Sequence, residues 1–481
     1  MGQLPLTVHA SPMLSDPIAA LATPPGRSAL AVIRLSGTGA LELAERVVSG
    51  VGNRESGAGV LAGVPDRVAT LVRFLGPDGR PFDQGLVTLF RAPRSYTGED
   101  MVELSCHGGL LAPAQLLAAL HAAGARRAAP GEFTRRALLN GKLDLLQAEA
   151  VGDLIDATAP AQGRAALRQL EGGLTRRIAA LREEALDLLA LLAYDIDFPE
   201  EDDGPVPRQR LFGALDAMAG RVERLLATAP AGERLREGAL VVLAGRPNAG
   251  KSSLFNALLG ADRALVTEIP GTTRDTIEAY TSLLGWPVRL ADTAGLRESA
   301  EPIERLGIEV SRRYVGAADL VLLCVESGRA LTPDERRLEG DRAALLVRSK
   351  ADLVPAGDRG EEEGVAVSAL SGEGLDLLAL AIAGRLFEGN RGNGGGGGEG
   401  EGGAGGYADL EPMLTRERHR HSLAGAAEEL AETRAHLGPG GDAVLAAHHL
   451  RAAVTALDEL IGLVHPDEVL GRVFERFCVG K

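Results

Sequence analysis

The stretch Gly245-Arg-Pro-Asn-Ala-Gly-Lys-Ser252 decides how the middle of this 481-residue chain folds. It matches G-x-x-x-x-G-K-S, a loop whose backbone N–H groups and lysine hold the phosphates of a nucleotide. The apolar run from Ala239 to Ala244 predicts a strand before the loop, and Leu254 to Leu259 predicts a helix after it. The motif requires this strand–loop–helix context, which a plain glycine-rich turn does not. The sequence therefore predicts a phosphate-binding loop.

Further motifs of the same kind follow later apolar runs. In chain order they are Asp292-Thr-Ala-Gly295, Ser349-Lys-Ala-Asp352 and Ser368-Ala-Leu370. Apolar runs such as 287–291, 320–325 and 344–347 alternate with helical stretches, which is typical of an α/β domain with a mainly parallel sheet. The ordered set resembles the G domain of translation-factor-like GTPases.

This resemblance implies a role for each motif. Lys251 would reach the β- and γ-phosphate oxygens, Ser252 would ligate Mg²⁺, and Asp292 would hold the metal through water. Lys350 would lay its aliphatic stem over the purine, and Asp352 would accept hydrogen bonds from guanine. The expected GTP-binding residues are Asn248, Ala249, Gly250, Lys251, Ser252, Ser253, Thr267, Glu268, Ile269, Pro270, Gly271, Thr272, Thr273, Asp292, Thr293, Ala294, Gly295, Ser349, Lys350, Ala351, Asp352, Ser368 and Ala369.

The base motif departs from the usual pattern at one position, because Ser349 stands where such motifs normally have Asn. A serine keeps a hydroxyl but loses the paired geometry of the amide. We expect weaker nucleotide affinity, by about 1 kcal/mol for one neutral hydrogen bond, with guanine preference retained through Asp352.

Lysine is rare in this chain: only four of its 51 basic residues are lysines, and the others are arginines. A lysine should persist where a compact ammonium is needed and a planar guanidinium does not fit. Lys251 and Lys350 already belong to the nucleotide motifs. Lys142 and Lys481 therefore indicate further functional positions.

Composition narrows the class of protein. The net charge of −15 argues against an overall polyanion binder, and an aromatic share of 3% argues against broad base-stacking surfaces. Three cysteines are too few for a disulfide framework and lack metal-binding spacing, which fits a reducing compartment. With no apparent signal peptide and no apolar run of membrane length, we expect a cytoplasmic protein without a membrane partner.

The pattern along the chain predicts an α+β multidomain protein. A β-containing part at 1–140 precedes a helical part at 141–235 and the α/β domain at 236–388. A glycine-rich tether at 389–406 leads to a second helical part at 407–481. Helices on both sides of the α/β domain could pack together, which would make that domain an insertion into one helical domain.

Motifs outside the α/β domain carry a more specific resemblance. They are Thr23-Pro-Pro-Gly-Arg27, Arg34-Leu-Ser-Gly37, Glu103-Leu-Ser-Cys-His-Gly-Gly109, Pro130-Gly-Glu-Phe-Thr134, Asn140-Gly-Lys-Leu-Asp-Leu-Leu-Gln-Ala-Glu149 and Phe477-Cys-Val-Gly-Lys481. In this order, and over nearly the whole chain, they resemble the MnmE (TrmE) family of tRNA modification GTPases.

The resemblance implies that 1–140 is a folate-binding and dimerisation domain of a homodimer. Arg34, Glu103, Lys142 and Lys481 would contact a tetrahydrofolate derivative, in its 5-formyl or 5,10-methylene form. A carboxylate suits the amine and amide donors of a pterin, and a cation suits the carboxylates of its glutamate tail. Glu103 and Lys142 could instead be ordinary surface charges. The last residue of the chain should fold back onto the N-terminal domain of its own or another subunit.

The resemblance also implies that K⁺ replaces an arginine finger. Its ligands would be Asn248, Thr267, Ile269 and Thr272, whereas Ser252 and Thr273 would hold Mg²⁺. Glu304 would be the catalytic residue that orients the attacking water, although on sequence alone it could be a solvated helix charge.

The three cysteines differ in their expected roles. Cys478 should be exposed near the end of the chain, where Lys481 could favour a thiolate. A catalytic role near the folate and a small residue packed at a helix end both remain open for it. Cys106 and Cys324 should be buried and inert.

The implied activity is K⁺-dependent GTP hydrolysis that helps to add an aminomethyl-type group, such as carboxymethylaminomethyl, to C5 of the wobble uridine of certain tRNAs. The implied partner is the FAD-dependent MnmG subunit in a heterotetramer. A GTP-switch ribosome-assembly factor without metabolite chemistry is the alternative. It would share the nucleotide motifs but not the folate residues or the terminal cysteine.

Overall fold

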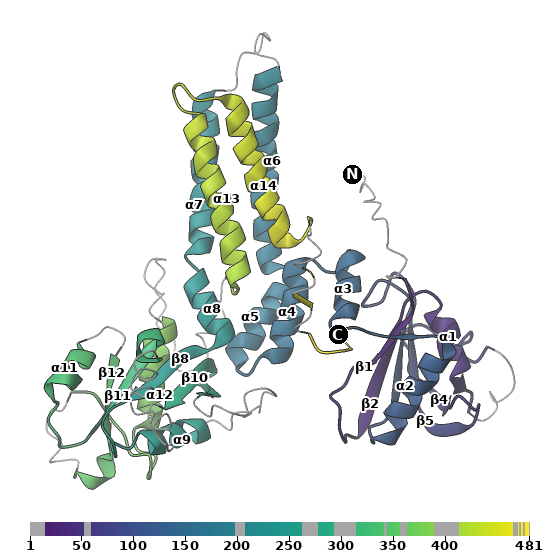
Figure 1. Cartoon of the computed structure of the whole chain (residues 1–481), viewed down its shortest axis with the longest axis horizontal. Coiled ribbons are helices and arrows are strands. Elements are labelled where there is room, and N and C mark those ends of the chain that lie inside the picture. Colours follow the sequence, from purple (N-terminus) through teal and green to yellow (C-terminus); the bar gives the residue numbers. More distant parts are fainter. Residues whose placement is uncertain are drawn as a thin grey trace, which may run out of the picture. The chain divides into compact units, whose positions relative to one another are not determined.

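The computed structural model describes residues 15–51, 59–197, 207–261, 278–292, 314–340, 344–355, 363–388, 413–464, 470, 473–474 and 477–480 (Figure 1). The chain divides into two compact units. The first unit comprises Met1–Gly152 and Ile461–Lys481, and the second comprises Asp153–Leu460. In the described parts, we find no helix with both the length and the apolar character that a membrane span requires.

Among the described residues, the first unit contains a seven-stranded sheet with the order β3-β4-β5-β6-β2-β1-β7. Its strands are β1 (Ile18–Leu21), β2 (Leu30–Ser36), β3 (Val48–Ser49), β4 (Thr70–Leu75), β5 (Pro81–Phe90), β6 (Met101–His107) and β7 (Arg126–Arg127). Neighbouring strands run antiparallel, but β1 and β7 are parallel. In β2, Ile33 and Leu35 are buried on one face, so Arg34 between them points to the other face.

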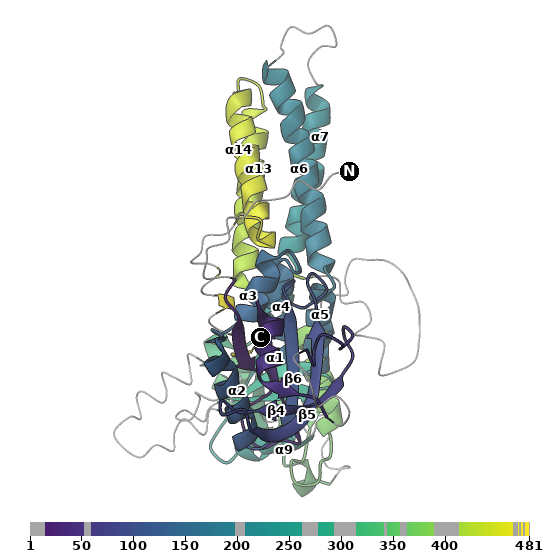
Figure 2. The same ribbon diagram turned by 90° about the vertical axis from the view of Figure 1, so that its right-hand side faces the viewer.

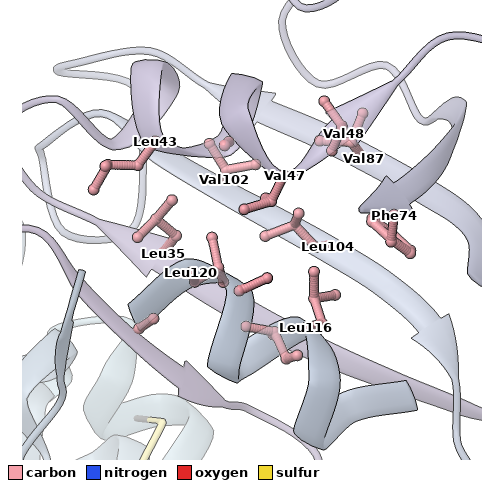
Figure 3. Close-up of a cluster of buried hydrophobic side chains, with 14 of the residues drawn as sticks. Leu35, Leu43, Val47, Val48, Phe74, Val87, Val102, Leu104, Leu116 and Leu120 are labelled. Carbon is pink, nitrogen blue, oxygen red and sulfur yellow. The ribbon is translucent and has the colours of Figure 1, made fainter. Parts of the chain in front are cut away.

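Helices complete the first unit. They are α1 (Ala40–Arg46), α2 (Leu111–Ala123), α3 (Glu132–Leu139) and the start of α4 (Leu145–Asp156). Figure 3 shows Leu116 and Leu120 of α2 directed toward Leu35 and Leu104 of the sheet, and all four are buried in one apolar cluster. This core fixes which face of the sheet remains for polar side chains.

The end of the chain belongs to the first unit. Leu470 and Phe474 pack with Leu138, Leu145 and Ala148 of α3 and α4. Val479 then pairs in an antiparallel bridge with Pro130. The described residues of this terminal segment therefore lie against the N-terminal part of the same chain. The predicted return concerned Lys481, which lies outside the described residues.

The second unit contains a helical bundle built from two distant stretches of sequence. Its helices are α5 (Pro160–Leu170), α6 (Gly173–Asp197), α7 (Arg208–Leu226), α8 (Ala229–Glu237), α13 (Glu417–His436) and α14 (Ala443–Ile461). Figures 1 and 2 show α13 beside α7, where Arg434 forms an ion pair with Asp216 at 2.6 Å. Arg182 of α6 similarly pairs with Asp458 of α14. Helices before and after the α/β domain therefore pack together, as the sequence predicted.

The described part of the α/β domain forms a six-stranded sheet with the order β13-β12-β11-β8-β10-β9. Its strands are β8 (Ala239–Ala244), β9 (Glu278–Leu283), β10 (Trp286–Asp292), β11 (Leu320–Glu326), β12 (Ala344–Ser349) and β13 (Val365–Ala366). Neighbours are parallel, but β9 runs antiparallel to β10. The associated helices are α9 (Lys251–Ala261), α11 (Pro333–Glu339), α12 (Leu375–Ala383), the 3₁₀ helix η4 (Ala351–Leu353) and the π-helical turn η6 (Gly384–Glu388).

The predicted α+β multidomain fold class is confirmed by these two units. The predicted strand 239–244 coincides with β8, and the strand predicted at 320–325 ends one residue later, in β11. In the first unit, β5 begins at Pro81, a position where a strand tolerates proline. The predicted tether at 389–406 lies outside the described residues.

Candidate functional site

The phosphate loop joins the end of β8 to the start of α9, as its motif requires. Gly245 has a φ of +142°, and a Cβ there would lie 2.4 Å from the carbonyl oxygen of Cys324, so only glycine fits. The Nζ of Lys251 is buried and donates to the carbonyl oxygens of Gly245 at 3.0 Å and Arg246 at 2.7 Å. The ammonium therefore lies inside the curve of the loop, where the sequence motif predicts nucleotide phosphates.

The metal side of the site consists of Ser252 and Asp292. The Ser252 hydroxyl donates to Oδ2 of Asp292 at 2.7 Å. Asp292 ends β10, which runs parallel to β8, so both carboxyl strand ends meet at one edge of the sheet. A hydroxyl and a carboxylate are hard oxygen donors that suit Mg²⁺, and the predicted pair thus fits the ion.

The base side of the site is fastened to the phosphate loop. Ser349, buried at the end of β12, donates through Oγ to the carbonyl oxygen of Ala249 at 2.7 Å. These residues lie 100 positions apart in the sequence. The serine that replaces the expected asparagine therefore keeps a hydrogen bond that ties the two loops together.

The neighbouring residues of the base motif lie at the same edge. Lys350 has a φ of +56°, and its Nζ pairs with Oε1 of Glu326 at 2.5 Å. Its hydrogen bond lowers the pKa of the Glu326 carboxyl. Asp352 is exposed in η4, and the Ala351 N–H donates to the carbonyl of Val367 at 3.0 Å. The next two predicted residues, the buried Ser368 and the half-buried Ala369, follow directly.

Sequence reasoning missed Glu326. The signal was its place at the carboxyl end of β11, which lies between β8 and β12 and therefore opens on the same edge. The ion pair with Glu326 fixes the ammonium end of the Lys350 side chain, whose aliphatic part we expected to cover the base. The structure also pairs Arg246 of the phosphate loop with Glu335 at 3.0 Å.

The first unit carries a second candidate site, on the polar face of its sheet. Arg34 of β2 and Glu103 of β6 lie directly opposite in register, and Nε donates to Oε1 at 2.9 Å. Their side chains are only 19% and 26% exposed, so the pair is partly shielded from water. The guanidinium also lies over the ring of Tyr96, 5.5 Å from its centroid. Tyr96 was not predicted.

Lys142 contacts the same loop as Arg34. Its Nζ donates to the carbonyl oxygen of Pro93 at 3.1 Å, and Gly98 faces its side chain. Burial raises the pKa of the Tyr96 hydroxyl, which shares a 2.8 Å hydrogen bond with Thr134. Loop 91–100 therefore connects to both predicted cations, Arg34 and Lys142.

The terminal motif lies against the segment 129–132. The carbonyl oxygen of Cys478 accepts from the N–H of Gly131 at 3.4 Å, and Gly480 approaches the carbonyl of Leu21 so closely that a Cβ would lie 2.3 Å from it. The Cys478 thiol is exposed, as predicted.

The other two cysteines are buried, also as predicted. Burial raises the pKa of the Cys106 thiol to about 11 and that of the Cys324 thiol to about 12. Neither is therefore a thiolate near neutral pH.

Several predicted residues lie outside the described part of the chain. They are Thr267, Glu268, Ile269, Pro270, Gly271, Thr272, Thr273, Thr293, Ala294, Gly295, Glu304 and Lys481. Most of the predicted K⁺ ligands and the predicted catalytic glutamate are among them.

Comparison with known proteins adds an independent finding. A family model described as the MnmE helical domain matches residues 145–478, more than half of the chain. A second, described as the GTP-binding protein TrmE N-terminus, matches residues 17–142. The chain belongs to the MnmE family of tRNA modification GTPases.

Relatives in the MnmE family match along almost the full length. The tRNA modification GTPase MnmE of Moorella thermoacetica is 42% identical, over 98% of this chain and 100% of its own. That of a Thermus thermophilus strain is 45% identical, over 97% of this chain and 99% of its own. The resemblance drawn from the motifs is thereby confirmed.

A solved structure, the G domain of the FeoB iron transporter of T. maritima, is 29% identical. The match spans 31% of the present chain and 97% of the FeoB G domain, with a TM-score of 0.22.

Proposed function

We propose that this chain is a K⁺-dependent GTPase that works with an FAD-dependent MnmG partner. Together they would add an aminomethyl-type (carboxymethylaminomethyl) group to C5 of the wobble uridine of certain tRNAs. The observation that carries the proposal is the meeting of Lys251, Ser252, Asp292 and Ser349 at one sheet edge, in a chain whose other unit carries the Arg34–Glu103 pair.

The sheet edge where Lys251, Ser252, Asp292 and Ser349 meet, called here the nucleotide edge, supports GTP as the substrate. Lys251 would neutralise phosphate charge from inside the loop, Ser252 and Thr273 would hold Mg²⁺, and Asp292 would hold it through water. Asp352 lies three residues after Ser349, which bonds to the phosphate loop. The Asp352 side chain is exposed, so a guanine base could reach it. A carboxylate at this position accepts from the amine and ring N–H of guanine, which adenine cannot offer in the same pattern.

The proposal for K⁺ rests on Asn248 and on residues outside the described part. Asn248 has a φ of +64° in the phosphate loop, so the loop bends at the residue expected to bind the ion. Thr267, Ile269 and Thr272 would complete the K⁺ shell. A cation there would offset charge that an arginine finger, worth about 10³–10⁵ in rate, offsets in other GTPases. Glu304 would hold the attacking water in line.

The polar face of the first unit supports binding of a tetrahydrofolate derivative, in its 5-formyl or 5,10-methylene form. Glu103 can accept from amine and amide donors, and Arg34 and Lys142 can meet carboxylates. Lys481 would join them from the end of the chain. Cys478 lies on the adjoining tail, and a catalytic role for its exposed thiol belongs to the same proposal.

We further propose a cytoplasmic homodimer that joins MnmG in a heterotetramer. The net charge of −15 fits a division of labour in which MnmG supplies much of the tRNA-binding surface. A ribosome-assembly factor would share the nucleotide edge but has no use for the Arg34–Glu103 pair. The full-length matches to MnmE relatives favour tRNA modification.

Two measurements on the purified full chain test the proposal. GTP turnover should be much faster in K⁺ than in Na⁺ at equal ionic strength, and ATP should compete poorly. Calorimetry should detect binding of 5-formyltetrahydrofolate. Equal rates in both salts together with no folate binding would leave the assembly-factor alternative as the better explanation.

A further inference from the structure

The turn between α13 and α14 brings several histidines and carboxylates together. The two helices lie side by side in Figures 1 and 2, and Arg418 near the start of α13 donates to the carbonyl of Leu460 near the end of α14. Helix α13 ends at His436, and α14 starts at Ala443. Only residues 437–442 connect the two helices at the turn.

Three side chains at this turn could share one metal ion. Glu432 and His436 are four residues apart on α13, so they project from the same helix face. His449 of α14 joins them, and one ligand atom from each of the three lies within 4.8 Å of the others. In a tetrahedral Zn²⁺ site two such ligands lie about 3.3 Å apart, so small side-chain rotations would close the shell.

A fourth residue orients one of the ligands. The Nδ1 of His449 forms a 2.8 Å hydrogen bond with Oε2 of Glu429, which lies one turn before Glu432. This bond leaves Nε2 as the nitrogen available to a metal. Metal-binding histidines usually donate their other N–H to a carboxylate in this way, and the partner fixes the ring and raises its basicity.

The two rings are also arranged in a way that a simple surface ion pair does not need. His436 and His449 stack with centroids 5.3 Å apart and planes 7° apart. Both rings are half-buried, and the stack brings the two imidazoles together at one point of the hairpin. A divalent cation bound to two neutral rings and the Glu432 carboxylate would satisfy all three groups at once.

We propose that Glu432, His436 and His449 form a Zn²⁺ site that staples the α13–α14 hairpin, with Glu429 as the positioning residue behind His449. Two imidazoles and one carboxylate suit Zn²⁺, and water would fill the fourth position because Glu432 is exposed. The ion would fix the turn of the hairpin that follows the α/β domain in the chain. This site is separate from the Mg²⁺ and K⁺ sites of the nucleotide edge.

Calorimetric titration with ZnCl₂ tests the site. The full-length chain, without a polyhistidine tag and with Cys478→Ser to remove the exposed thiol, is stripped with chelator and kept in excess Mg²⁺ and GDP. We expect one Zn²⁺ per chain with a Kd in the micromolar range or tighter. His436→Ala and His449→Ala should each weaken binding at least 30-fold, and Glu429→Gln about 10-fold.

The matched control is His421→Ala, an exposed histidine of the same helix about 22 Å from His436. It should bind Zn²⁺ like the parent chain. Zn²⁺ should also raise the Tm of the parent and of this control but not of His436→Ala, because a ligand that binds only the folded state stabilises it. Glu432→Gln, which keeps the side-chain shape, serves if an alanine variant fails to fold.

Two outcomes overturn the proposal. One is a parent chain that binds no Zn²⁺ at 100 µM. The other is a stoichiometric Zn²⁺ site that His436→Ala, His449→Ala and Glu432→Gln all leave unchanged, because the ion would then lie elsewhere in the chain.

Discussion

The nucleotide edge of the α/β domain and the Arg34–Glu103 face of the first unit show two ways of building a site. At the nucleotide edge, parallel strands end together, and short loops that follow them carry the chemistry. On the first unit, the candidate side chains Arg34 and Glu103 stand on the face of an antiparallel sheet and alternate with core residues. The first site depends on backbone conformation, and the second depends on strand register.

This difference determines how each site should fail. Ligand binding at the loop site should be sensitive to the size and shape of a single side chain inside the loop, because the loop backbone encloses the volume that this side chain occupies. A face site is sensitive to charge, because Arg34 and Glu103 are each other's main partner. Variants that damage one site and spare the other therefore test the comparison directly.

The largest effect is expected from Lys251→Arg. The buried ammonium sits between the carbonyls of Gly245 and Arg246, and a planar guanidinium is too broad for that position. Loss of a preorganised donor at the phosphates should lower kcat for GTP by about 10²–10³-fold. Folate binding should stay at the parental level. A variant with parental GTP turnover would contradict both the loop geometry and the inference from rare lysines.

A charge change on the sheet face should produce the next largest effect. Arg34→Met keeps much of the side-chain length but removes the cation that meets Glu103 and a ligand carboxylate. Affinity for 5-formyltetrahydrofolate should fall about 10- to 100-fold, the range for a hydrogen bond to a charged group. Intrinsic GTP turnover should hold. Arg80→Met is the control, because Arg80 in the same unit is 87% exposed. If both variants bind folate equally well, Arg34 is not part of the site.

The two sites also differed in how far the sequence could predict them. Local motifs were enough to place Lys251, Ser252 and Asp292, because the phosphate loop is a contiguous structure with one known conformation. The link from Ser349 to Ala249 was not predicted, since it spans 100 residues and depends on the adjacency of strands.

On the first unit, the family resemblance named Arg34 but could not reveal its partner. The pairing with Glu103 follows from the antiparallel register of β2 and β6, and the stacking on Tyr96 follows from loop 91–100. Both depend on the tertiary arrangement. The family resemblance named Glu103, whereas nothing in the sequence indicated Tyr96.

The segment that supports the terminal motif should respond to acid. Burial alone would raise the pKa of Glu132, but hydrogen bonds from Arg126, the Ala129 N–H and Arg136 outweigh it and lower the pKa to about 2. Because the folded-state pKa is below the ordinary 4.5, this stabilisation is complete above about pH 4.5 and is lost as pH falls toward 2. It amounts to roughly 3 kcal/mol.

Glu132→Gln should therefore unfold more easily at neutral pH, and the difference from the parent should shrink as pH falls from about 5 toward 2. Urea unfolding of the two chains at several pH values measures it. The hydrogen bonds of Glu132 hold the segment 129–132 in place. Cys478 packs against this segment, because its carbonyl accepts from the Gly131 N–H. A difference that stays constant across this range would refute the role of the charge.

The smallest effect should come from Ser349, where the loop site meets a strand end. Ser349→Ala removes a buried hydrogen bond to the carbonyl of Ala249, which costs about 1 kcal/mol, or roughly a 5-fold weaker Kd for GDP. Ser349→Asn should bind GDP at least as tightly as the parent, since the amide can reach the loop carbonyl and offers further donors. Fluorescent GDP titration measures all three chains. If Ser349→Ala matched the parent, the hydroxyl would be a passive replacement, and the two loops would be held together by backbone contacts alone.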